Sequence, residues 1–158
     1  MKQALFGSQI FCGERFYDDY ALLVDGKSIV DMVEKNDIPE NFNKIELDDG
    51  ILAPGFIDLQ VNGGGGKLFN NSPDKESLRT IIKAHQFFGT TSLMPTVISD
   101  SMEVLEQCIK TVTEETKNNA SLLGIHIEGP FFNVKYRGIH QKQYINTINS
   151  DYLNLFES

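Results

Sequence analysis

The sequence predicts an α/β protein in which a small β-rich segment is followed by alternating strands and helices. Two observations support this class. Short apolar runs flank Asp-Gly turns in the first 50 residues, and strand-like and helix-like segments alternate after residue 54. The length of 158 residues and the hydrophobic content of 41% are sufficient for one buried core or slightly more.

The N-terminal segment has the pattern of short strands joined by turns. Two apolar runs, at residues 21–24 and 28–33, flank the turn at Asp25 and Gly26, which is typical of a β-hairpin. A second Asp-Gly pair, at residues 49–50, leads into another expected strand. Few and short strands make a poor core by themselves, so we expect this β segment to need a partner segment.

Strands are expected after residue 54 at 56–61, 90–94 and 122–127, with Pro95 ending the second of them. Between these strands lie segments whose apolar residues have helical spacing. Ser72 is expected to cap the first helix, and Asp100 with Glu103 to open the second, while a further helix begins near Tyr152 at the end of the chain.

This alternation favours a parallel sheet with right-handed crossovers. Three strand–helix units are compatible with the beginning of a doubly wound sheet or of a (β/α)8 barrel. A complete barrel takes about 250 residues, so we expect that the 158 residues do not close one alone.

Charge and composition exclude several classes of function. The net charge of −8 disfavours binding to nucleic acid, and no basic stripe suits an anionic membrane. No apolar run approaches the roughly 20 residues of a membrane span, and we expect that the N-terminal residues do not form a signal peptide. Cys12 and Cys108 are expected to be free thiols in a reducing compartment, so a cytoplasmic protein is predicted.

The first strand after residue 54 presents a row of polar side chains. Asp58, Gln60 and Asn62 alternate with apolar residues and therefore share one face of the strand. Polar side chains on a buried strand are costly unless a site requires them. The alternative interpretation is an exposed face of an edge strand.

The third strand ends with a candidate ligand. Glu128 lies just before a Gly-Pro pair, where a carboxylate is able to bind a metal or act as an acid or base. A carboxylate that points into solvent is the alternative. His126, one step deeper on the same face, is expected to pack and hydrogen-bond rather than ligate, and His85 is read as a structural residue of its helix. His140, in the following loop, suits either substrate contact or a plain surface position.

Three segments together resemble a known family. PGFIDLQVNG at residues 54–63 resembles the first barrel strand of the amidohydrolase superfamily. GIHIEGPF at residues 124–131 is similar to the H-x-E-G-P strand of N-acetylglucosamine-6-phosphate deacetylases, and the GIH segment at 138–140 to their substrate loop. The first motif is shared by many amidohydrolases, whereas the combination is much more specific.

The resemblance implies a fold and a domain organisation. Residues 1–52 would be the N-terminal part of a small β-sandwich domain, and residues 53–158 the first three β/α units of an incomplete, TIM-type (β/α)8 barrel. It also implies hydrolysis of the N-acetyl group of N-acetylglucosamine 6-phosphate, which yields glucosamine 6-phosphate and acetate. The protein would be a dimer when complete.

The resemblance also implies roles for individual residues. Glu128 matches the family's metal-binding glutamate, and His140, with Ile139 beside it, matches the substrate-contacting loop. Gln60 and Asn62 stand where many amidohydrolases carry the H-x-H ligands of a second metal, and carboxamides are poor zinc ligands. We therefore expect one divalent metal, with zinc favoured over iron or another divalent ion.

Several parts of the family's active site are expected to lie beyond Ser158. These are two metal-binding histidines and the catalytic aspartate, which come from later barrel strands, so no catalytic residue is assigned within the chain. We expect these 158 residues alone not to turn over substrate. A second hypothesis is a non-catalytic remnant that serves as a binding or assembly module. A third, a cyclic-amide hydrolase, is disfavoured by Gln60 and Asn62 in place of H-x-H.

Overall fold

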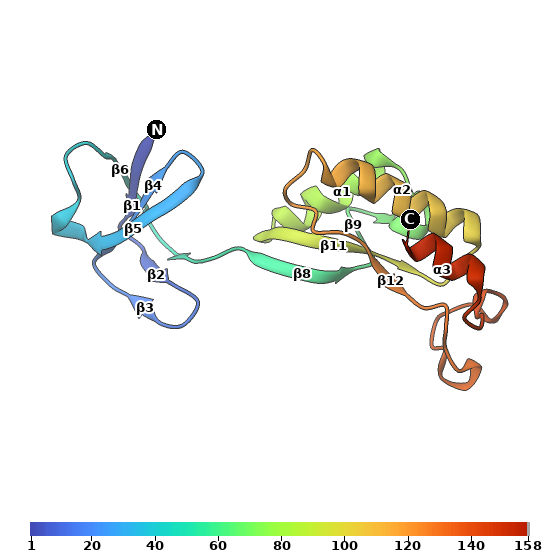
Figure 1. Cartoon of the computed structure of the whole chain (residues 1–158). Coiled ribbons are helices and arrows are strands. Elements are labelled where there is room, and N and C mark those ends of the chain that lie inside the picture. The colour runs from blue at the N-terminus through green and yellow to red at the C-terminus, as the bar shows by residue number, and fades with distance from the viewer. Residues whose placement is uncertain (158) are drawn as a thin grey trace. The chain divides into compact units, whose positions relative to one another are not determined.

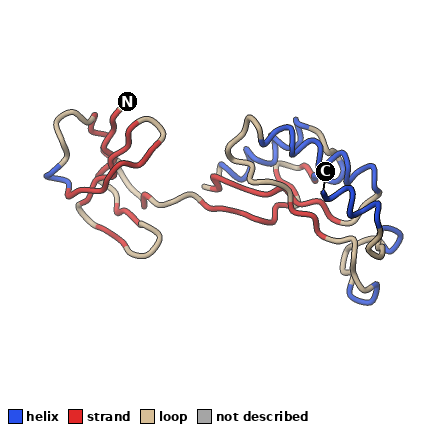
Figure 2. Tube along the Cα trace, in the orientation of Figure 1, coloured by secondary structure: helices blue, strands red, loops and turns tan. Residues whose placement is uncertain are grey.

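The computed structural model describes residues 1–157 and divides the chain into two compact units (Figure 1). The first unit is Met1–Pro54 and the second is Gly55–Ser158. The first contains only strands and one short helical turn, whereas the second combines strands and helices (Figure 2). The mixed α/β class with a small N-terminal β region is therefore confirmed.

The first unit contains a four-stranded and a three-stranded sheet. The four-stranded sheet has the order β5-β4-β1-β6, with β1 (Lys2–Phe6), β4 (Tyr20–Asp25), β5 (Ser28–Glu34) and β6 (Asn43–Glu46). The other has the order β3-β2-β7, with β2 (Gln9–Phe11), β3 (Phe16–Tyr17) and β7 (Ile51–Leu52). A short 3₁₀ turn, η1 (Lys35–Asp37), follows β5.

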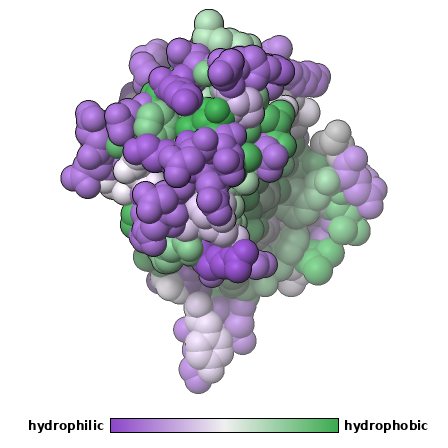
Figure 3. All heavy atoms as spheres, turned by 90° about the vertical axis from the view of Figure 1, so that its left-hand side faces the viewer, coloured by the Kyte–Doolittle hydropathy of each residue, from purple (hydrophilic) through white to green (hydrophobic). Residues whose placement is uncertain are grey.

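The predicted hairpin of the first unit is confirmed, because β4 and β5 pair antiparallel across Gly26, whose φ is +60°. Small and apolar side chains from β1, from β4 and from the residue after η1 form a core, consisting of Ala4, Ala21, Leu23 and Ile38. On the side of the chain that Figure 3 presents, hydrophilic side chains predominate around smaller apolar areas.

The second unit is built on a parallel sheet of order β12-β11-β8. Its strands are β8 (Phe56–Val61), β11 (Thr90–Ile98) and β12 (His126–Glu128). The helices α1 (Lys75–Gln86) and α2 (Met102–Thr116) connect successive strands and lie on one side of the sheet (Figure 1), and α3 (Ser150–Glu157) follows. The small hairpin β9 (Gly63–Gly64) and β10 (Lys67–Leu68) precedes the turn η2 (Phe69–Asn71). The predicted parallel sheet is confirmed.

The core of the second unit lies between the sheet and the helices. Both helices are amphipathic, and their buried faces meet Leu93 and Val97 of β11. The largest fully buried side chains are Phe69, Leu78, Ile81, Leu93 and Leu105. Among the described residues, no helix is both long and apolar enough to cross a membrane.

Strand boundaries differ from the expectation at two places. Pro95 does not end its strand, since β11 continues to Ile98; the register with β8 shifts between Leu93 and Pro95, where proline has no N–H to donate. The third strand is much shorter than expected. Gly124, at a φ of +145°, breaks the run, so that β12 contains three residues and Leu122 forms an isolated bridge to Leu93.

The helix caps also differ. Asp74, not Ser72, caps α1, because its carboxylate accepts a hydrogen bond from the N–H of Ser77 at 2.7 Å. Ser101, not Asp100, caps α2. The predictions of Ser72 and Asp100 are wrong because two residues suited to capping lie within two positions of each other at each helix start, and the sequence does not distinguish them.

Both cysteines are free, as expected, and they should differ in reactivity. Backbone hydrogen bonds from Arg15 and Glu14 lower the pKa of the exposed Cys12 thiol, whereas burial raises the pKa of Cys108 to about 12. We expect an aromatic disulfide reagent to modify Cys12 of the folded chain rapidly, and to modify Cys108 only after the chain is unfolded in denaturant. A C12S variant should lose the rapid phase; equal modification of both thiols in the folded chain would contradict this assignment.

Candidate metal- and substrate-binding site

Glu128 is the last residue of β12 and pairs in register with Ile98 of the central strand β11. Its carboxylate is partly buried, with 32% of the side chain exposed. Gln60, near the end of β8, donates a hydrogen bond from Nε2 to Glu128 Oε2 at 3.2 Å. Because parallel strands bring their carboxyl ends to one edge of a sheet, residues 68 positions apart meet there.

His140 approaches the same carboxylate from the loop after β12. Its Nε2 lies 3.4 Å from Glu128 Oε1. The residue is only 5% exposed, and the ring of Phe132 packs against its imidazole with centroids 4.4 Å apart. The plain surface position that the loop context also allowed is therefore wrong for His140.

The Nδ1 edge of the imidazole contacts Ser99, which directly follows β11. Nδ1 of His140 lies 2.9 Å from Oγ of Ser99 and accepts a hydrogen bond from the Ser99 backbone N–H at 3.3 Å. Gly129 makes this arrangement possible. It has a φ of +97°, and a Cβ there would lie 2.3 Å from Ser99 Oγ.

The remaining predicted residues lie around this cluster or apart from it. Ile139 precedes His140 and is 80% exposed. Asn62 is half-buried, and its carbonyl accepts a hydrogen bond from the N–H of Phe69. His126 faces Thr96 Oγ1 at 3.2 Å, and His85 Nε2 lies 2.9 Å from the carbonyl of Gly63, in keeping with structural roles for both.

Two residues of this region have no signal in the sequence. Ser99 directly follows β11, a strand that the pattern ended at Pro95. Asn70 is 6% exposed, and its side-chain amide donates from Nδ2 to the carbonyl of Ile98 and accepts at Oδ1 from the N–H of Ile98. Its Nδ2 also donates to Asp100 Oδ2 at 3.0 Å. Sequence spacing does not reveal such contacts, since they join segments 28 to 41 residues apart.

The donor set suits part of a metal site. The Glu128 carboxylate fits one coordination position of a divalent cation, and its oxygens are already oriented by Gln60 and His140. Within residues 1–157, no three His, Cys, Asp or Glu side chains lie together as metal ligands. A catalytic zinc site usually has three protein ligands, so the described residues fit one position and not a whole site.

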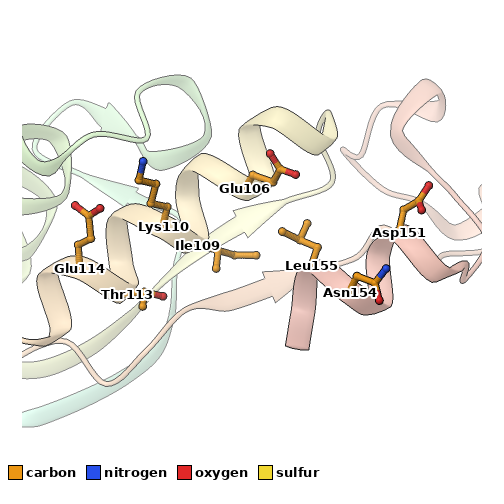
Figure 4. A pocket seen from close by; sticks show the side chains of 8 residues that line it. All are labelled: Glu106, Ile109, Lys110, Thr113, Glu114, Asp151, Asn154 and Leu155. Carbon is orange, nitrogen blue, oxygen red and sulfur yellow. The ribbon is translucent and has the colours of Figure 1, made fainter. Parts of the chain in front are cut away.

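Grooves on the helical side do not share this chemistry. One of about 620 Å³ lies between α2 and α3, and Figure 4 shows Ile109 and Leu155 in its lining. Around them are Glu106, Lys110 and Asp151, charges of both signs. None of the predicted site residues lines this groove, so the cluster around Glu128 is the candidate functional site.

Comparison with protein-family models finds no match. Among curated proteins, the chain is 45% identical over 103 residues to the N-acetylgalactosamine-6-phosphate deacetylase of Shewanella sp., which covers 65% of this chain and 26% of that protein. It is 32% identical over 152 residues to the N-acetylglucosamine-6-phosphate deacetylase of Haemophilus influenzae, covering 96% of this chain and 40% of the relative. The chain thus spans less than half the length of these relatives.

The fold agrees with the sequence comparison. The crystal structure of N-acetylglucosamine-6-phosphate deacetylase from Pasteurella multocida superimposes with a TM-score of 0.93 at 32% identity. The match covers 99% of this chain and 41% of that one. Sequence and fold agree along essentially the whole chain, which therefore belongs to the N-acetylglucosamine-6-phosphate deacetylase family and matches less than half of the length of these relatives.

Proposed function

We propose that the chain provides one wall of the active site of a metal-dependent deacetylase that hydrolyses N-acetylglucosamine 6-phosphate. Water would cleave the amide bond and release glucosamine 6-phosphate and acetate. The observation that supports this most directly is the cluster at the end of the sheet, where Gln60 and His140 both contact the Glu128 carboxylate. The names of the relatives support the substrate class.

Each residue of the cluster has a role in this proposal. Glu128 would hold one divalent metal, zinc before iron or another ion; when bound, the metal supplies polarisation of the amide carbonyl and activation of water. His140 would donate a hydrogen bond from Nε2 to the substrate carbonyl as negative charge develops on its oxygen. The exposed Ile139 would contact the sugar. Gln60 and Asn62 would leave the second metal position without imidazole ligands.

The proposal includes an architecture. Residues 1–52 would belong to a small β-sandwich domain, and residues 53–158 would be the first three β/α units of a (β/α)8 barrel that this chain leaves incomplete. Support comes from the parallel order β12-β11-β8 and from the carboxyl-end location of the cluster. The complete protein would be a cytoplasmic dimer whose small-molecule partner is an amino sugar phosphate.

A second candidate substrate is N-acetylgalactosamine 6-phosphate, the epimer at carbon 4 of the sugar. The relative from Shewanella, 45% identical over 103 residues, is named for that substrate. Both epimers carry the same N-acetyl group, so the cluster around Glu128 would serve either, and the discrimination would come from contacts to the sugar hydroxyls.

An activity assay tests both substrates. We expect the purified 158-residue chain with added zinc to release no acetate, because its described residues supply one metal position. A version extended to the length of the relatives should deacetylate one or both sugars. Metal-dependent turnover by the 158-residue chain would contradict the proposed inactivity. An extended version that folds and binds zinc but deacetylates neither sugar would contradict the proposed function.

A further inference from the structure

The imidazole of His140 is held at Nδ1 by two groups of one residue. The backbone N–H of Ser99 donates to Nδ1 at 3.3 Å, and Ser99 Oγ lies 2.9 Å from the same atom. Ser99 is 3% exposed and His140 5% exposed. Water therefore has little access to this contact, and the ring nitrogen depends on Ser99 for its hydrogen bonds.

The two contacts determine which ring nitrogen carries the proton. A backbone N–H only donates, so Nδ1 must act as an acceptor. A neutral imidazole has one donor and one acceptor nitrogen, and the proton is therefore on Nε2. Nε2 is also the atom that faces Glu128 Oε1, at 3.4 Å. The ring thus presents an N–H donor to the site.

The segment that carries Ser99 is itself fixed. Asn70 donates to the carbonyl of Ile98 and accepts from its N–H, both at 3.0 Å. On the opposite side, the absence of a side chain at Gly129 lets the backbone approach Ser99 Oγ, and Phe132 packs against the imidazole. These contacts fix Ser99 with respect to His140, and none of them involves the proposed metal position.

We propose that Ser99 is a positioning residue, which holds His140 in the Nε2–H tautomer and aims that N–H at the Glu128 edge of the site. This inference deepens the proposed function and rests on it for its catalytic meaning. In that function, a fixed Nε2–H is a hydrogen-bond donor ready for the substrate oxygen, and Nε2 is not free to accept a proton from water.

His126 provides an internal comparison in the same sheet. Its Nδ1 lies 3.2 Å from Thr96 Oγ1, a hydroxyl that either donates or accepts. This contact alone does not select a tautomer. The added backbone N–H is what distinguishes the surroundings of His140, so the two histidines should respond to different substitutions.

Nitrogen-15 NMR of the imidazoles tests the proposal in the whole chain without any assay of catalysis. The chain has three histidines, and H140Q identifies the signals of His140. At about pH 9, where imidazoles are neutral, we expect His140 to show an unprotonated Nδ1 and a protonated Nε2. S99P removes the backbone N–H that donates to Nδ1 and should move both nitrogen shifts toward an averaged tautomer. S99A removes only the hydroxyl and keeps that N–H, so its His140 shifts should remain those of the wild type. T96V should change His126 alone.

Two outcomes would overturn the proposal. One is a wild-type His140 that carries its proton on Nδ1; the other is a folded S99P chain whose His140 signals match the wild type. S99A is the control for loss of the hydroxyl, because its backbone N–H still satisfies Nδ1, and the amide spectrum verifies that each variant folds. The tautomer is read without substrate or metal, so a failure of the deacetylase assignment would leave this measurement valid and is recognised separately.

Discussion

Replacing Glu128 by glutamine is expected to lower the deacetylase activity of the extended protein by at least about 100-fold. Substitutions of residues that only support a metal ligand already lower metal affinity or activity about 10- to 100-fold. Glu128 is the proposed ligand itself, so its loss should cost at least as much. Glutamine keeps the size of the side chain but removes the negative charge and one of the two acceptor oxygens that face Gln60 and His140. The measurement is kcat/KM together with the zinc content of the purified protein.

The matched control is the same change at Glu106, an exposed carboxylate on α2 that lines the groove between α2 and α3. E106Q should retain both activity and zinc. If E128Q kept wild-type activity and bound zinc normally, Glu128 would not be a metal ligand, and the proposed site would have to be abandoned.

Replacing Gly129 by alanine is expected to lower the free energy of unfolding by about 2–5 kcal/mol, which combines backbone strain with overpacking. The φ of +97° is unfavourable for alanine, and the new Cβ would lie 2.3 Å from Ser99 Oγ and 2.6 Å from a ring carbon of Phe132. Ser99 is buried and has little room to move. Urea denaturation of the 158-residue chain measures the change.

Gly138 is the control for backbone strain alone. Its φ is +57°, yet a Cβ there would meet nothing within 4 Å. G138A should therefore cost only about 1–2 kcal/mol. Equal losses in G129A and G138A would show that the close approach of Gly129 to Ser99 does not limit stability.

The parts of the fold that depend on local chemistry were predictable. The turn at Asp25 and Gly26 defines the β4–β5 hairpin, and period-two alternation defines β8. Where a tertiary neighbour decides, the sequence was insufficient. Pro95 ends many strands, but here a register shift against β8 accommodates it, and no local pattern reveals that shift.

The candidate site shows the same division. The sequence predicts Glu128, Gln60 and His140 as site residues, and the structure brings polar atoms of Gln60 and His140 within 3.4 Å of the Glu128 carboxylate. Ser99 and Asn70 were not selected, because ordinary polar residues after a strand or in a turn have no distinguishing spacing. Their importance depends on partners 28 to 41 residues away, which only the folded chain defines.

The strand order has a consequence for the protein as it emerges from the ribosome. All strand pairs of the first unit lie within residues 2–52, so this unit is synthesised in full before β8 appears. The parallel pairing of β8 must then wait for β11, and the Gln60–Glu128 contact for 68 further residues. Units that are synthesised first generally fold first. We therefore expect the strand pairs of the first unit to form early in nascent chains and the cluster around Glu128 to form last.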